Sequence, residues 1–228
     1  MSPDPESDQG VPGRSAQREY ERRRDRRQLE RRSRPRLLTA LVGLSATEKR
    51  RLAADRQWAN GARGEELLAE SLASRCPNLI LLHDRRMQTG RGNIDHIAIA
   101  ATGVYVIDAK RYRGRIQVTK PLFGAPKLRI AGRDRTKLVE GLSRQVAVVQ
   151  DAIRPVAPDV PVHGCLCFVR PAGPLAEIGL PLLRTLTIKG HRLYYPRRLA
   201  RRLNRPGPLT QERAIAVRAE LARRLPAA

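Results

Sequence analysis

The stretch NIDHIAIAATGVYVIDAK, residues 93–110, decides how this chain folds. It holds two apolar runs of strand-forming residues, joined at Thr102-Gly103 by a turn that is typical of antiparallel neighbours. Asp95 begins the first run, and Asp108-x-Lys110 closes the second. Carboxylates beside such apolar strands are costly unless they bind a cation or find hydrogen-bond partners. The pattern therefore predicts two adjacent strands that bring two acids and a lysine to one end of a sheet.

The two acids and the lysine have the composition of a metal site. Side chains two residues apart on a strand share a face, so Asp108 and Lys110 point the same way, and tight pairing places Asp95 opposite them. Two carboxylates can hold Mg²⁺ or Mn²⁺ against a substrate phosphate, while Lys110 positions or activates the attacking water. The helix before the strands could add a third carboxylate, for which Glu65, directly after Gly64, is the best candidate. We therefore predict a metal-dependent phosphodiesterase with Glu65, Asp95 and Asp108 as ligands.

Three motifs of the chain resemble those of the nuclease-related domain (NERD) family, which is placed in the PD-(D/E)xK nuclease superfamily. They are Gly61-x-x-Gly64-Glu65, the stretch 93–96, and the stretch 103–114, and the resemblance covers about residues 58–168. It implies an α/β fold with a restriction-endonuclease-like core, in which helices flank a mixed central sheet. By residue-for-residue match it implies catalytic roles for Glu65, Asp95, Asp108 and Lys110.

The resemblance also implies a supporting residue. In many relatives a glutamine on the following helix assists the site, a role that falls here to Gln145, with Glu140 a less favoured substitute. Ile94 stands where a proline names the superfamily motif, as is usual in the nuclease-related family. The acid at Asp108 replaces a glutamate, which is equivalent for metal binding. His96 points to the opposite face of its strand and is expected in the core or in a supporting role.

The charge of the chain indicates a polyanionic partner. Among 228 residues there are 45 Lys and Arg against 22 Asp and Glu, a net charge of +23. Such a field attracts nucleic acid, with DNA favoured, although part of the charge could simply reflect genome composition or a solubilising coat. No base-reading motif is present, so low sequence specificity is expected.

Two basic groups are predicted to contact nucleic acid. The first follows the second strand, and the second lies near the C-terminus: Arg111, Tyr112, Arg113 and Arg115, then Arg197, Arg198 and Arg201. The first group could instead blunt a sheet edge, and the second could be a solvated helix face.

The cysteines and the hydropathy pattern indicate a cytoplasmic protein. No stretch approaches the ~20 apolar residues that span a bilayer, and the N-terminus lacks the apolar core of a secretion signal. Three cysteines cannot build a disulfide framework, which indicates a reducing compartment. Cys165-x-Cys167 has no further Cys/His pair nearby, which argues against zinc.

We divide the chain into three parts. Residues 1–44 form an Arg-rich extension, either disordered or a solvated helix; residues 45–170 form the nuclease-related domain with its N-terminal helices; residues 171–228 form a basic helical appendage packed on the core. The expected helices are one that a capping box opens at Ser45 and that breaks near Asn60-Gly61, then 62–75, 136–153, 196–203 and 210–225. The expected strands are 78–82, 94–100, 104–110, a ribbon of 114–118 with 127–130 that extends the sheet, 162–169 parallel to an inner strand, and 186–188.

Two other functions compete with the nuclease. One is a non-catalytic nucleic-acid-binding module that keeps the fold, and the other is an adaptor whose basic arm contacts acidic lipid or a partner protein. If the substrate is duplex, cutting both strands needs two sites, hence a homodimer or sequential nicking.

Overall fold

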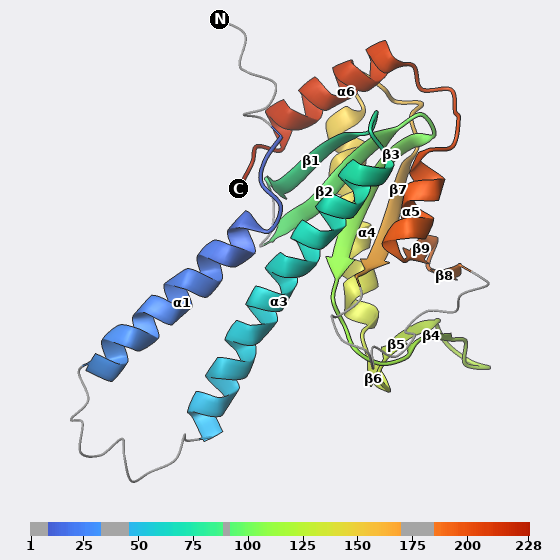
Figure 1. Ribbon diagram of the computed structural model, residues 1–228. Coiled ribbons are helices and arrows are strands. Elements are labelled where there is room, and N and C mark those ends of the chain that lie inside the picture. The colour runs from blue at the N-terminus through green and yellow to red at the C-terminus, as the bar shows by residue number, and fades with distance from the viewer. Residues whose placement is uncertain (1–8, 33–45, 89–91, 170–184) are drawn as a thin grey trace, which may run out of the picture.

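The computed structural model describes residues 9–32, 46–88, 92–169 and 185–228, which form a mixed α/β fold (Figure 1). The predicted fold class is confirmed: a six-stranded mixed sheet has helices on both faces, beside a separate three-stranded sheet. The helices are α1 (Arg14–Arg32), α3 (Ala46–Arg75), α4 (Thr136–Ile153), α5 (Pro196–Leu203) and α6 (Gln211–Arg224). The strands are β1 (Ile80–Arg86), β2 (Asn93–Ala100), β3 (Gly103–Lys110), β4 (Ile116–Thr119), β5 (Lys127–Ile130), β6 (Arg133–Asp134), β7 (Val162–Phe168), β8 (Leu186–Ile188) and β9 (His191–Tyr194).

The central sheet runs in the order β1-β2-β3-β7-β9-β8. β1, β2 and β3 are antiparallel neighbours, β7 and β9 run parallel to β3, and β8 returns antiparallel to β9. The helix α4 lies between β3 and β7 in the chain, which is the connection that two parallel strands require. The prediction of a parallel strand after this helix is therefore confirmed.

Both faces of the sheet are covered, which explains why its inner strands read as almost continuous apolar runs. The helices α4 and α6 pack on one face, and α3 and α5 pack on the other. Seven of the eight residues of β3 are buried. The charged side chains of β3 lie only at its C-terminal end, where the sheet meets the candidate site.

The chain departs from two local predictions. The expected break at Asn60-Gly61 is wrong, since α3 continues through both residues; a helical glycine costs only about 1 kcal/mol relative to alanine, which packing offsets. The ribbon of β4 and β5 does not extend the central sheet, because β3 pairs with β2 along one edge and with β7 along the other; with β6 the ribbon forms the separate sheet. The predicted helix start at Ser45 lies outside the described residues.

The Arg-rich segment 14–32 forms the helix α1, one of the two alternatives that its composition left open. It lies beside α3, and the pair extends away from the sheet (Figure 1). The guanidinium of Arg27 forms an ion pair with the carboxylate of Asp55 at 2.6 Å, and Asp55 is only 4% exposed. Arg23 stacks over the Trp58 ring at 5.5 Å. These contacts order a segment that has little apolar surface of its own.

All three cysteines are buried free thiols. Among the helices of the described ranges, a search for a bilayer-spanning apolar stretch finds none.

Candidate active site

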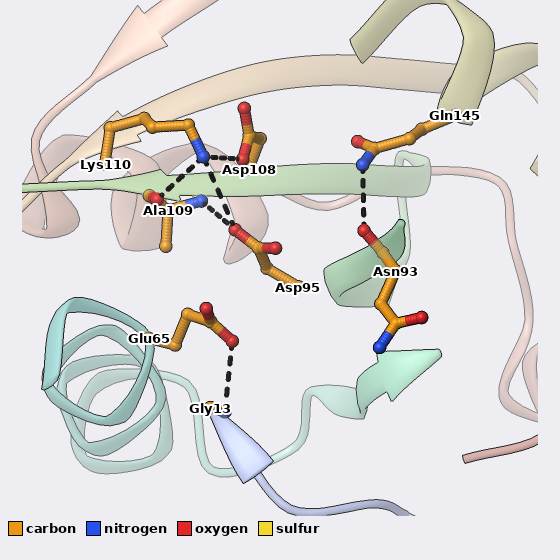
Figure 2. Close-up of polar contacts among 8 residues, drawn as sticks. All are labelled: Gly13, Glu65, Asn93, Asp95, Asp108, Ala109, Lys110 and Gln145. Atoms are coloured by element: carbon orange, nitrogen blue, oxygen red, sulfur yellow. Dashed lines mark hydrogen bonds and ion pairs between the residues drawn. The ribbon is translucent and has the colours of Figure 1, made fainter. Parts of the chain in front are cut away.

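The carboxylates of Asp95 and Asp108 meet at the ammonium of Lys110 (Figure 2). The ladder between β2 and β3 stops one residue before the two acids, which therefore face each other at the end of the pairing. Lys110 Nζ donates to Asp108 Oδ1 and lies 3.9 Å from Asp95 Oδ2. Asp95 Oδ2 also accepts the backbone N–H of Ala109 at 2.8 Å. The structure thus brings together the three residues predicted from the strand pattern.

The electrostatics of this trio favour a cation. Burial raises the pKa of Asp108 to about 7, against the attraction of Lys110, and the neighbouring Asp95 adds to the rise. Burial lowers the pKa of Lys110, but Asp108 and then Asp95 outweigh burial and raise it. Two acids in a desolvated position are stable only with positive charge between them, which the ammonium supplies here.

Glu65 faces the trio from α3 (Figure 2). It is 8% exposed, and its Oε2 accepts the backbone N–H of Gly13 at 3.0 Å. Burial raises its pKa to about 9, and Asp95 adds to the rise. The preceding Gly64 lets the helix approach the end of β3, since a Cβ there would lie 3.3 Å from Cβ of Arg111. This explains the Gly-Glu pair of the sequence motif: Gly64 allows the helix to lie close to the end of β3, and Glu65 can then face the two aspartates.

A fourth carboxylate, Asp84 of β1, was missed by the sequence analysis. The register of β1 and β2 places it across from Asp95, and it is 2% exposed with φ 46°. Its oxygens accept Ser15 N–H at 2.6 Å, Ser15 Oγ at 2.7 Å and Asn93 Nδ2 at 2.9 Å. The sequence did contain a pattern that could have indicated Asp84: like Asp95 and Asp108, it lies near the end of an apolar run. The predicted strand, however, ended at Leu82, so Asp84 was left outside it.

The N-terminal residues 9–15 also belong to this neighbourhood, which composition did not indicate. Gln9 O accepts the N–H of His83 at 2.8 Å, so the segment lies along β1. Gly10 and Gly13 both have positive φ, 77° and 72°. A Cβ on Gly10 would lie 2.2 Å from the carbonyl oxygen of His83, and one on Gly13 would lie 2.9 Å from that of Ala62. Only glycine fits these two positions. Through Gly13 and Ser15, the segment donates hydrogen bonds to the carboxylates of Glu65 and Asp84.

The fit of residues 9–15 can be tested by replacing Gly13 with alanine. We expect Gly13→Ala to lower the free energy of unfolding by about 1–3 kcal/mol more than Gly132→Ala, measured by urea denaturation. Gly132 is the matched control because its φ is 75° but an added Cβ meets nothing within 4 Å. Equal losses in the two variants would contradict tight docking of the segment.

Gln145 does not contact the two aspartates. Its Nε2 donates to the backbone oxygen of Asn93 at 3.1 Å, two residues before Asp95 (Figure 2). Its Oε1 is buried and has no hydrogen-bond partner within the described part of the chain. The geometry therefore makes Gln145 a residue that holds the start of β2, and Glu140 instead lies 3.7 Å from Lys189.

His96 points away from the acids, as its place on the strand predicts. It is fully buried, and its Nδ1 lies 2.7 Å from Nδ1 of His83 on β1. Burial lowers the pKa of both rings to about 3, so both are neutral at physiological pH. The pair belongs to the interior of the sheet.

The two basic groups predicted to contact nucleic acid lie in different places. Arg111 and Tyr112 are half-buried directly after β3, while Arg113 and Arg115 are exposed in the same loop, next to the candidate site. Arg111 donates to Asn60 Oδ1 at 3.3 Å. The second group lies on α5, where Arg197 and Arg201 are exposed and Arg198 is half-buried.

The donor set suits a hard divalent cation, since Asp95, Asp108 and Glu65 offer carboxylate oxygens only. An ammonium already lies between the two aspartates, so a cation position exists there. As the side chains stand, however, no three His, Cys, Asp or Glu residues of the described ranges converge closely enough to hold a metal ion. A three-carboxylate site would therefore need the side chains of Glu65 and Lys110 to move.

The raised pKa of Glu65 gives a pH prediction. A carboxyl whose pKa rises on folding stabilises the fold fully below its usual value of 4.5, and this contribution is lost as the pH rises towards 9. In EDTA, the stability advantage of wild type over Glu65→Gln should therefore shrink between pH 5 and pH 9 in urea titrations. The exposed Glu70→Gln is the control and should show no such trend; a constant advantage for Glu65 would contradict the assignment.

The α/β core is consistent with a nuclease-like core: an acid-x-lysine pair closes β3, and further acids lie on the adjoining elements. Residues 60–169 match the family model described as the nuclease-related domain (NERD). The match begins at the Gly61-x-x-Gly64-Glu65 motif and ends just after β7, so it includes every predicted catalytic residue. Among curated proteins and solved structures, no match is found.

Proposed function

We propose that this protein is a metal-dependent phosphodiesterase that cuts nucleic acid, DNA in preference, with low sequence specificity. The observation that carries the proposal is the position of the Lys110 ammonium between Asp95 and Asp108. The nuclease-related domain and the net charge of +23 support nucleic acid as the substrate.

In this proposal Asp95, Asp108 and Glu65 would hold Mg²⁺ or Mn²⁺. Such an ion, when bound, neutralises charge on a phosphate and makes a neighbouring water more acidic. Asp84 is not included, because both of its oxygens already accept hydrogen bonds from Ser15.

Lys110 has two roles in the proposed reaction. While the site is free of substrate, its ammonium balances the charge of the two aspartates. During cleavage it donates hydrogen bonds to the attacking water or to a phosphate oxygen, and so offsets the charge that builds on the phosphate. The high pKa of Lys110 keeps it protonated for this task. Gln145 fixes the backbone of Asn93 and thereby the start of the strand that carries Asp95.

The test is cleavage of labelled single- and double-stranded DNA and RNA by the full chain, with Mg²⁺, Mn²⁺ or EDTA. We expect cutting that requires the metal, most rapid on DNA and with little sequence preference. If duplex is cut on both strands at once, light scattering should show a homodimer. Binding without cutting under every metal would overturn the proposal.

A second candidate is a non-catalytic nucleic-acid-binding module that keeps the nuclease fold. The observation that favours it is the hydrogen bond of Gly13 to Glu65, which occupies one oxygen of the third predicted ligand. The same assay separates the candidates, because the module binds every substrate with a strong salt dependence and cuts none.

A further inference from the structure

Five arginines line a pocket beside the helix α5. We call it the arginine pocket; it has a volume of about 220 Å³ and is lined by Arg192 of β9, by Arg198, Arg201 and Arg202 of α5, and by Arg205, Thr185 and Tyr194. No acidic residue of the described ranges lines it. A smaller adjoining pocket shares Arg192, Tyr194 and Arg202 with it and also has no acidic lining residue.

The spacing of these arginines brings like charges onto one side of α5. Arg198, Arg201 and Arg202 follow each other at intervals that place them on one helical face, while Leu199, Ala200 and Leu203 are buried on the other; Arg205 comes just after the helix ends. Like charges three and four residues apart destabilise a helix slightly. An anion between them reverses this effect, and guanidinium groups match phosphate oxygens in pairs.

The neighbouring contacts leave most of these charges unpaired. Arg198 donates to Thr185 Oγ1 at 3.5 Å, and the Arg202 guanidinium stands over the Tyr105 ring at 5.9 Å. Within the described ranges, Arg192, Arg201, Arg202 and Arg205 form no ion pair, although most acids of the same ranges do. These four arginines therefore concentrate positive charge in the pocket without an ion-pair partner among the described residues.

The sheet places the arginine pocket level with the candidate active site. Tyr194 of β9 aligns with Cys167 of β7, which aligns with Ala109, the residue between Asp108 and Lys110. Two strand spacings separate β9 from β3, or about 10 Å. Ala109 and Tyr194 pack on the α3/α5 face of the sheet, opposite to the side chains of Asp108 and Lys110. A nucleic-acid strand with its reacting phosphate at Lys110 would therefore reach the pocket around the end of β3 and β7, with a phosphate a few nucleotides away.

We propose that the arginine pocket binds a phosphate of the nucleic-acid strand on which the candidate site acts. This rests on the proposed function for the identity of the strand, but the pocket's affinity for phosphate does not depend on cleavage. The proposal adds Arg192, Arg202 and Arg205 to the phosphate-binding residues Arg198 and Arg201 that the sequence predicted. Arg197 is left out of this set, because it does not line the pocket.

The experiment measures binding in an Asp108→Asn background, so that no substrate is consumed. Fluorescence anisotropy with a labelled 20-nucleotide single strand compares Arg201→Gln/Arg205→Gln with Arg129→Gln/Arg133→Gln, a control that removes the same charge from exposed positions of β5 and β6. We expect the pocket variant to bind at least tenfold more weakly and to lose about 0.7 from the slope of log affinity against log salt, for one phosphate contact. The control should change affinity less than threefold. Equal losses in both variants would show that only the overall charge matters and would overturn the proposal.

A second arm identifies the source of the phosphate, using ADP and inorganic phosphate as probes in thermal-shift titrations. One outcome is that ADP stabilises wild type but not the pocket variant, while the two proteins bind the oligonucleotide equally well. The pocket would then be a site for free nucleotides, and the proposal would be overturned. The two hypotheses fail separately. If wild type cuts nothing but the pocket variant loses binding, only the nuclease hypothesis is rejected. If wild type cuts and the pocket variant binds and cuts equally well, only the pocket hypothesis is rejected.

Discussion

Replacing Asp108 with alanine should abolish cutting and leave nucleic-acid binding intact. We expect the cleavage rate to fall by on the order of 10³ or more, which corresponds to about 4 kcal/mol of transition-state stabilisation. The reason is that Asp108 supplies one of the proposed metal ligands and also holds the ammonium of Lys110. Affinity should change little, because the basic surfaces that attract the substrate are untouched. Gel cleavage and anisotropy on the same protein sample measure both quantities.

Two further variants make this result interpretable. Asp108→Asn keeps the shape of the side chain and should be as inactive as the alanine variant. Asp151→Ala removes an exposed carboxylate of α4 that pairs with Arg154 at 2.7 Å, and it should cut normally. Retained cutting in Asp108→Asn would contradict a ligand role for the carboxylate, and equal loss in Asp151→Ala would point to a general effect of charge.

Removing the ammonium of Lys110 should destabilise the protein until a divalent cation replaces it. Lys110→Met leaves Asp95 and Asp108 facing each other without positive charge, and breaking such a buried group costs about 3 kcal/mol. We therefore expect a lower free energy of unfolding in EDTA than for wild type. Mg²⁺ should restore much of the loss, because binding to the folded state alone stabilises it. Urea denaturation with EDTA or with Mg²⁺ measures both effects.

The matched control for this experiment is Lys137→Met, which removes an exposed lysine of α4. It should change stability little and should respond to Mg²⁺ as wild type does. If Lys110→Met gains no more from Mg²⁺ than Lys137→Met, the carboxylates do not form a cation site.

The strand-turn-strand at residues 93–110 was predictable because its information is local. Alternating faces and a two-residue turn leave one register, and that register sets Asp95 opposite Asp108. The helix α4 was likewise predicted with the bounds that it has, because its apolar spacing is regular. Glu65 needed the family resemblance or the preceding glycine, since nothing in its own helix pattern points to the sheet.

The contacts around Asp84 could not be predicted in the same way. They depend on residues 9–15, which lie far away in sequence and are too polar to show a packing pattern. What holds this segment is a set of close backbone approaches at Gly10 and Gly13 and the hydrogen bonds of Ser15. Such contacts depend on tertiary placement, and composition alone indicated only a charged extension. The arginine pocket could not be predicted for the same reason. Arg192 lies on β9, and only the pairing of β9 with β7 and β8 brings it beside the arginines of α5.

The central claim is that Glu65, Asp95 and Asp108 form one divalent-cation site, and Mn²⁺ binding followed by electron paramagnetic resonance tests it most directly, without a substrate. We expect one Mn²⁺ per chain in wild type, no comparable binding in Asp95→Asn/Asp108→Asn, and unchanged binding in the exposed control Asp151→Asn. No Mn²⁺ bound by wild type, or equal binding by all three proteins, would contradict the claim.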